Sequence, residues 1–166
     1  MDVGFLNAFV QSICNTFETM CDLKVQVGKP NLGEDTNGDV SAVIGFSGDA
    51  AGSVIIEFDF ETASKVATAF AKTEINPDHP DFADALGELA NMVAGGAKAK
   101  FDGISVDISL PSVVIGQHHR FPTSRNVKRL LLPCSTEAGA FSVHVGMVVS
   151  KVTPQPAQPQ TAGAQA

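Results

Sequence analysis

The strongest constraint on the fold is a β-hairpin predicted in the first third of the chain. Two β-rich runs, residues 40–46 and 52–58, flank the tripeptide Ser47-Gly48-Asp49. A short polar turn that contains glycine, between two such runs, is typical of two antiparallel strands. The chain is therefore expected to build an antiparallel sheet around residues 40–58.

The other segments alternate between helical and strand periodicity. Residues 5–21 repeat apolar side chains at the helical spacing, and Gly28-Lys29-Pro30 ends the strand that follows them. Residues 31–39 are polar and predict a loop. The remaining elements, in chain order, are a helix over 5–21, a strand over 23–27, helices over 61–71 and 81–101, and strands over 104–115, 127–133 and 141–149.

The resulting order, α-β-β-β-α-α-β-β-β, predicts an α/β chain of the α+β type. We expect a mainly antiparallel sheet of about six strands, with the helices packed on one face. Residues 1–152 are expected to form one domain. Residues 153–166 are rich in Pro, Gln and Ala without a pattern, which predicts a disordered tail.

Charge and hydropathy exclude several classes of partner. Of the 166 residues, 44% are hydrophobic and the net charge is -7, so a nucleic-acid partner is not expected. The basic residues between Arg120 and Arg129 are interpreted as solvated loop charges. No apolar run spans a bilayer, and no signal peptide is recognised, so we expect a cytoplasmic protein without a membrane partner.

The cysteines and histidines do not predict a metal site or a disulfide framework. Cys14, Cys21 and Cys134 are an odd number and are interpreted as buried free thiols in a reducing compartment. The adjacent pair His118-His119 has no Cys or carboxylate at ligand spacing and is interpreted as solvated loop histidines. His144 falls within a predicted strand and has no visible partner.

The helix over 81–101 has two distinct faces when its residues are plotted at about 100° per residue. The core stripe consists of Phe82, Leu86, Leu89 and Val93. The opposite side carries acidic, amide, glycine and amine groups, namely Asp84, Glu88, Asn91, Gly95 and Lys98. A polar stripe opposite a core stripe is, in the simplest interpretation, a solvent face.

Three details favour contact with another protein instead. The acidic pair Asp84 and Glu88 at i,i+4 costs a few tenths of a kcal/mol, and each glycine of Gly95-Gly96 costs about 1 kcal/mol relative to alanine. Small and soft apolar residues border the stripe, namely Ala85, Met92 and Ala99. An open alternative is that the two glycines form the C-cap of a shorter helix.

The segment Gly87-Glu88-Leu89-Ala90-Asn91-Met92-Val93-Ala94-Gly95-Gly96-Ala97-Lys98 is similar to the Glu-x-x-Asn signature helix of the CheC/CheX/FliY phosphatase family. The resemblance extends over residues 1 to about 150 and includes Gly38–Ser41, Gly52–Val54, Asp107–Pro111 and Thr136–Gly139. Within its predicted helices the chain has one Glu-x-x-Asn site rather than the two that are typical of CheC. This difference favours the CheX branch.

The resemblance implies a chemotaxis phosphatase that hydrolyses the aspartyl-phosphate of a phosphorylated CheY-like response regulator. Asn91 would orient the attacking water, and Glu88 would engage the regulator's active-site lysine. Partner contacts are expected from Asp84, Met92, Gly95 and Lys98. No cofactor is expected in this chain, whereas Mg²⁺ is expected in the partner, and the resemblance also implies a homodimer formed through the sheets. The alternative is a non-catalytic module of the same fold that binds a response regulator or flagellar-switch components.

Overall fold

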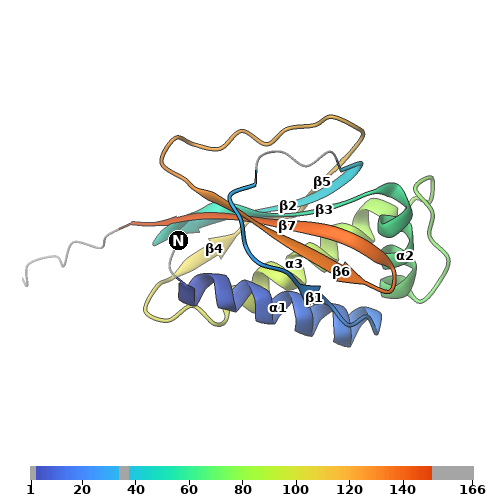
Figure 1. Cartoon of the computed structure of the whole chain (residues 1–166), viewed down its shortest axis with the longest axis horizontal. Coiled ribbons are helices and arrows are strands. Elements are labelled where there is room, and N and C mark those ends of the chain that lie inside the picture. The colour runs from blue at the N-terminus through green and yellow to red at the C-terminus, as the bar shows by residue number, and fades with distance from the viewer. Residues whose placement is uncertain (1–2, 34–37, 151–166) are drawn as a thin grey trace, which may run out of the picture.

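The computed structural model of the chain describes residues 3–33 and 38–150. In this part of the chain three helices cover one face of a seven-stranded sheet (Figure 1). The helices are α1 (Val3–Cys21), α2 (Phe60–Ala71) and α3 (Phe82–Lys98). The strands are β1 (Gln26–Val27), β2 (Val40–Gly48), β3 (Ala50–Phe58), β4 (Val106–Ile108), β5 (Ser112–Ile115), β6 (Arg129–Thr136) and β7 (Gly139–Val149). The predicted tail over 153–166 lies outside the described residues.

Every strand pair in the sheet is antiparallel, as the sequence predicts. The strand order is β1-β6-β7-β3-β2-β4, and β5 pairs with β2 alongside β4. The predicted hairpin forms between β2 and β3, in register from Val40↔Phe58 to Phe46↔Gly52. Gly48 turns the chain at a φ of 105°, a left-handed conformation that glycine tolerates.

The expected single strand over 104–115 is wrong, because a bulge divides it into β4 and β5. Phe46 pairs with Ile108 and Val43 with Ser112, so residues 109–111 lie opposite only residues 44–45. The edge therefore carries one extra residue, which is the definition of a β-bulge. Pro111 lies within this bulge and has no backbone N–H for a ladder bond. The sheet has seven strands rather than six for this reason.

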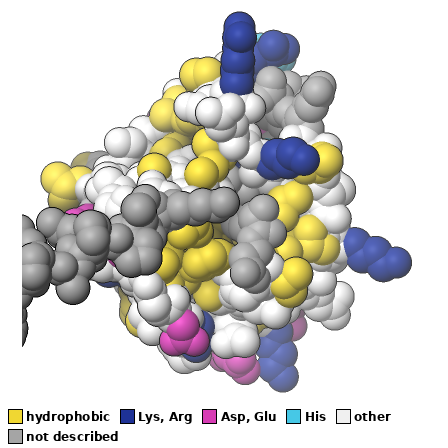
Figure 2. All heavy atoms as spheres, turned by 90° about the vertical axis from the view of Figure 1, so that its left-hand side faces the viewer, with side chains coloured by type: hydrophobic (Ala, Val, Ile, Leu, Met, Phe, Trp, Pro, Cys, Tyr) yellow, Lys and Arg dark blue, Asp and Glu magenta, His cyan; other side chains and the backbone are white. Residues whose placement is uncertain are grey.

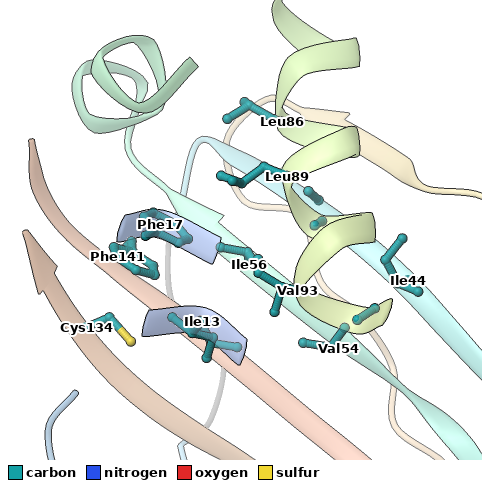
Figure 3. Packing of buried hydrophobic residues seen from close by; sticks show 14 of the residues in the cluster. Ile13, Phe17, Ile44, Val54, Ile56, Leu86, Leu89, Val93, Cys134 and Phe141 are labelled. Atoms are coloured by element: carbon teal, nitrogen blue, oxygen red, sulfur yellow. The ribbon is translucent and has the colours of Figure 1, made fainter. Parts of the chain in front are cut away.

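The hydrophobic core lies between the sheet and the helices. The predicted core stripe of α3 is confirmed, since Phe82, Leu86, Leu89 and Val93 are each at most 1% exposed. Figure 3 shows Leu89 and Val93 beside Ile44, Val54 and Ile56 of β2 and β3. Burial of each such side chain stabilises the fold by about 1.5–3 kcal/mol. This packing fixes which face of α3 points away from the sheet.

Helix α1 holds α3 through a close contact at Gly96. The Ser12 hydroxyl donates to the Val93 carbonyl over 2.7 Å, and a Cβ at position 96 would collide with the Ser12 oxygen. The helix continues through Gly95 and Gly96 to Lys98, so the alternative of a C-cap at these glycines is wrong. Gly96 instead allows two helices to approach each other closely.

The sheet face opposite the helices carries a small set of polar side chains. His144 Nε2 lies 3.5 Å from Glu57 Oε2, and both side chains are buried. His119 Nε2 bonds to the Ser41 hydroxyl over 2.6 Å, and its Nδ1 bonds to the Gly116 carbonyl. The interpretation of His119 as a solvated loop histidine is therefore wrong, and His144 has the partner that the sequence did not reveal.

Candidate functional site

The candidate site is the face of α3 that points away from the core. The helix begins after Asp81, has Asp84 in its first turn and Lys98 in its last turn. These charges match the positive and negative ends of the helix dipole. The site residues therefore project from a regular element whose opposite face is anchored in the core.

The structure brings all six predicted site residues onto this face. Asp84 and Glu88 are exposed, and the other four are half-buried, namely Asn91, Met92, Gly95 and Lys98. The apolar border differs from the expectation, because Ala85 is only 8% exposed and belongs to the core. Met92 and Ala99 remain accessible.

Glu88 and Asn91 stand one helical turn apart. The i,i+3 spacing places their Cβ atoms about 5–6 Å from each other. Among the described residues, neither the Glu88 carboxylate nor the Asn91 carboxamide has a side-chain hydrogen bond. An exposed acid and a neighbouring amide with all their hydrogen-bonding groups available can enter one pocket of a partner.

A hollow of about 420 Å³ lies beside Glu88, between α3 and the bulged edge of the sheet. Four residues of the helix and two of the edge line it: Ala83, Asp84, Gly87, Glu88, Pro111 and Val113. Sequence analysis missed Pro111 and Val113 as neighbours of Glu88. The one available signal was that Asp107–Pro111 resembles the same family as the helix.

Gly87 allows the helix to lie this close to the edge. A Cβ at position 87 would be 3.3 Å from the Pro111 Cβ and 3.4 Å from the Val113 Cγ2. These distances leave little room for a side chain, so glycine fits where a larger residue would push α3 away from β5. The depth and width of the hollow depend on this contact.

Cysteine-based phosphatase chemistry has no support in the structure. Burial raises the pKa of Cys21 to about 11 and the pKa of Cys134 to about 12. Burial, together with the nearby Glu18 carboxylate, also raises the pKa of Cys14, which is half-buried. Since the thiolate is the nucleophilic form, these side chains are poor nucleophiles at neutral pH.

The described residues contain neither a metal-binding cluster nor a membrane-spanning helix. Within 3–33 and 38–150, no group of three or more His, Cys, Asp or Glu residues could hold a metal ion. None of the helices in that same part of the chain is long and apolar enough to cross a bilayer.

Comparisons with known proteins agree with the fold. The family described as "Chemotaxis phosphatase CheX" matches residues 40–135. A CheY-P phosphatase CheX of Thermotoga maritima is 30% identical over 152 residues, which are 89% of this chain and 97% of the relative. A crystal structure of a CheC-like superfamily protein from a Shewanella species has a TM-score of 0.81 and 31% identity, and the match covers 89% of this chain and 99% of that one.

A third protein with this fold was crystallised with a partner. It is the CheX of Borrelia burgdorferi in a complex with CheY, BeF₃ and Mg²⁺, at a TM-score of 0.76 and 24% identity, with 88% of this chain and 99% of that chain covered. At this identity the likeness establishes the shared fold.

The antiparallel sheet with three helices on one face is the fold of the CheC-like class. Within that class the chain belongs to the CheX chemotaxis phosphatase family.

Proposed function

We propose that this protein hydrolyses the aspartyl-phosphate of a phosphorylated CheY-like response regulator. The observation that carries the proposal is the pair of exposed Glu88 and half-buried Asn91 on α3, whose side chains have no hydrogen bonds to other described residues, in a chain of the CheX family. A relative that is 30% identical is named a CheY-P phosphatase, which supports this class of substrate.

The chemistry requires little of the phosphatase itself. An aspartyl-phosphate is a reactive acyl phosphate, and the regulator supplies its own Mg²⁺. A water oxygen attacks the phosphorus atom while the bond from phosphorus to the aspartate oxygen breaks, which releases inorganic phosphate and the free carboxylate. What remains to be added is alignment of the water with the leaving oxygen.

Asn91 is the group that we assign to this water. A carboxamide can accept two hydrogen bonds and donate two, so it can hold a water in a fixed direction without forming a covalent intermediate. Its half-buried position limits the number of rotamers that it must lose on binding. Asn91 is thus proposed as the catalytic residue that orients water.

Glu88 is proposed to anchor the regulator by an ion pair with its active-site lysine. The Glu88 side chain is exposed and lies at the mouth of the hollow. The charged pair would become partly desolvated in the complex, where it is stronger than in water. Asp84, Met92, Gly95 and Lys98 are proposed to contact the regulator around this pair.

The test compares stimulated phosphate release with binding. We expect Asn91→Ala to abolish the stimulation while binding is mostly retained, and Glu88→Ala to weaken both. Binding is measured to the regulator with beryllofluoride and Mg²⁺ in place of the phosphoryl group, so that no hydrolysis interferes.

Matched controls come from exposed residues elsewhere. Asn15→Ala on α1 and Glu74→Ala after α2 remove the same groups from exposed positions outside the site. Both should behave as the unchanged protein. Full stimulation by the Asn91 variant would refute its assignment, whereas binding without stimulation by the unchanged protein would make the chain a non-catalytic binding module.

A further inference from the structure

Leu110 is the most exposed large hydrophobic residue in the described part of the chain, with 87% of its surface accessible. It lies in the bulge between β4 and β5. Single exposed leucines are common on protein surfaces, so exposure alone has no functional meaning. Its functional meaning comes from its position beside the candidate site and from the rigidity of the backbone that holds it.

Hydrogen bonds hold the backbone at the bulge. The Ser109 amide donates to the Gly45 carbonyl, and the Gly45 amide donates to the Ser109 hydroxyl, both over 2.9 Å. The same hydroxyl donates to the Leu110 carbonyl over 2.8 Å. Pro111 then fixes the next φ angle. Because the backbone of the bulge is already ordered, little backbone conformational entropy is lost when a partner buries Leu110.

Leu110 also borders the candidate site. Its neighbour Pro111 lines the same hollow as Asp84 and Glu88. The Cα atoms of residues 110 and 111 are about 3.8 Å apart. A standard interface buries about 800 Å² on each partner, equivalent to a disc of about 16 Å radius. A partner seated over Glu88 would therefore extend across the hollow to Leu110.

We propose that Leu110 is an apolar docking anchor for the response regulator. The leucine would bury against an apolar patch beside the phosphorylated pocket of the regulator. This inference rests on the proposed function for its occupant, and it adds a contact outside α3 that recognises the protein surface rather than the phosphoryl group. The ion pair at Glu88 would then orient the regulator, and Leu110 would add an apolar contact with its surface.

The anchor has a distinct kinetic signature, because Leu110 does not reach the reacting atoms. Its loss should weaken binding by about tenfold to a hundredfold, as expected for one buried leucine. The stimulated rate at saturating regulator should stay unchanged. Asn91→Ala should show the opposite pattern, with binding retained and the rate lost.

The experiment uses Leu110→Ala and Leu110→Asp in the full chain. Leu32→Ala is the matched control, since Leu32 is 70% exposed and lies next to Asn31, which pairs with Leu131 of β6 in the other half of the sheet. Binding to the beryllofluoride-activated regulator gives Kd, steady-state release gives KM and kcat, and light scattering gives the mass.

We expect a raised Kd and KM for both Leu110 variants, more so for aspartate, with kcat and mass unchanged and the Leu32 variant unaffected. Unchanged Kd and KM for the Leu110 variants would overturn the proposal that Leu110 is a docking anchor. A lower kcat at saturating regulator would also overturn it. So would a changed mass, because a second copy of the chain would then cover Leu110. Binding without stimulated release by the unchanged protein would refute the proposed function but not the anchor, because Kd still reports on Leu110. Absence of any binding would refute both.

Discussion

Gly95 and Gly96 are neighbours in one helix but have different surroundings. Apart from the adjoining residues and backbone of its own helix, nothing lies within 4 Å of a Cβ at position 95, whereas a Cβ at position 96 would collide with the buried Ser12 hydroxyl. Gly95→Ala should raise the free energy of unfolding by about 1 kcal/mol through helix propensity alone. Gly96→Ala gains the same propensity, but overpacking costs about 1–3 kcal/mol, so we expect a net loss.

Urea unfolding of both variants measures the difference. Equal stability changes in the two variants would contradict the assignment of Gly96 to helix packing. Gly95 has no packing role in the described chain, so its lack of a side chain leaves space on the exposed face beside Asn91. A large side chain at position 95, such as that of Phe, should preserve the fold and reduce binding of the regulator.

At the same scale, the sequence predicted which residues of α3 share a face, because a helix imposes one angle per residue. Glu88 and Asn91 share a face for that reason alone. Pro111 and Val113 could not be placed beside them, since they belong to a strand whose distance from α3 is set by Gly87 and by the packing of the whole sheet. The hollow was therefore missed, although the sequence analysis had placed Asp84 and Glu88, two of its four helical residues, on this face.

Among the elements, the bulge between β4 and β5 offers a local test. The extra residue interrupts the backbone ladder opposite Gly45, and the Ser109 hydroxyl takes the place of a backbone acceptor. Ser109→Ala removes that acceptor and should lower the free energy of unfolding by about 1 kcal/mol. The Gly45 amide should exchange its hydrogen faster, and regulator binding should weaken because Leu110 is less rigidly held.

Hydrogen exchange followed by NMR at Gly45 is the decisive measurement. Unchanged protection of this amide would mean that the serine side chain does not hold the edge. Thr19→Ala is a suitable control, since it also removes a hydroxyl with a local backbone bond, on α1, away from the bulge.

The elements differ in how well the sequence predicts them. The hairpin of β2 and β3 is local, so its turn residues determine the register, and the prediction was confirmed. The run over 104–115 alternates like one strand, but its pairing partner β2 lies more than fifty residues earlier. Only that long-range register reveals the extra residue at 109–111.

For the whole molecule, the site depends on two distant parts of the chain. Helix α3 contributes Glu88 and Asn91, and the edge of the sheet contributes Pro111 and the adjacent Leu110. Both are attached to the same core, because α3 packs on β2 and both β4 and β5 pair with β2. Shared attachment to β2 keeps the helix face and the edge at a fixed separation.

The homodimer implied by the sequence stays a prediction, and one end of the sheet is suited to it. Strand β7 extends beyond its pairing with β6, which ends at the pair Arg129↔Gly146. Val148 and Val149 lie past this pair and are 39% and 40% exposed. Figure 2 shows hydrophobic side chains gathered on the face at this end of the molecule, where β7 ends and α1 begins (Figure 1). At Val148 and Val149 strand β7 is paired with β3 on one side, while its other side has no partner strand among the described residues and can pair with a second copy.

We therefore expect light scattering to give twice the chain mass of 17.3 kDa. Val149→Lys should shift the mass towards one chain, because a buried lysine without a partner opposes association. Leu110→Asp should leave the dimer intact, since the proposed docking anchor and the strand end are separate surfaces. A single-chain mass for the unchanged protein would exclude the dimer, and a dimer that tolerates Val149→Lys would place its interface elsewhere on the sheet.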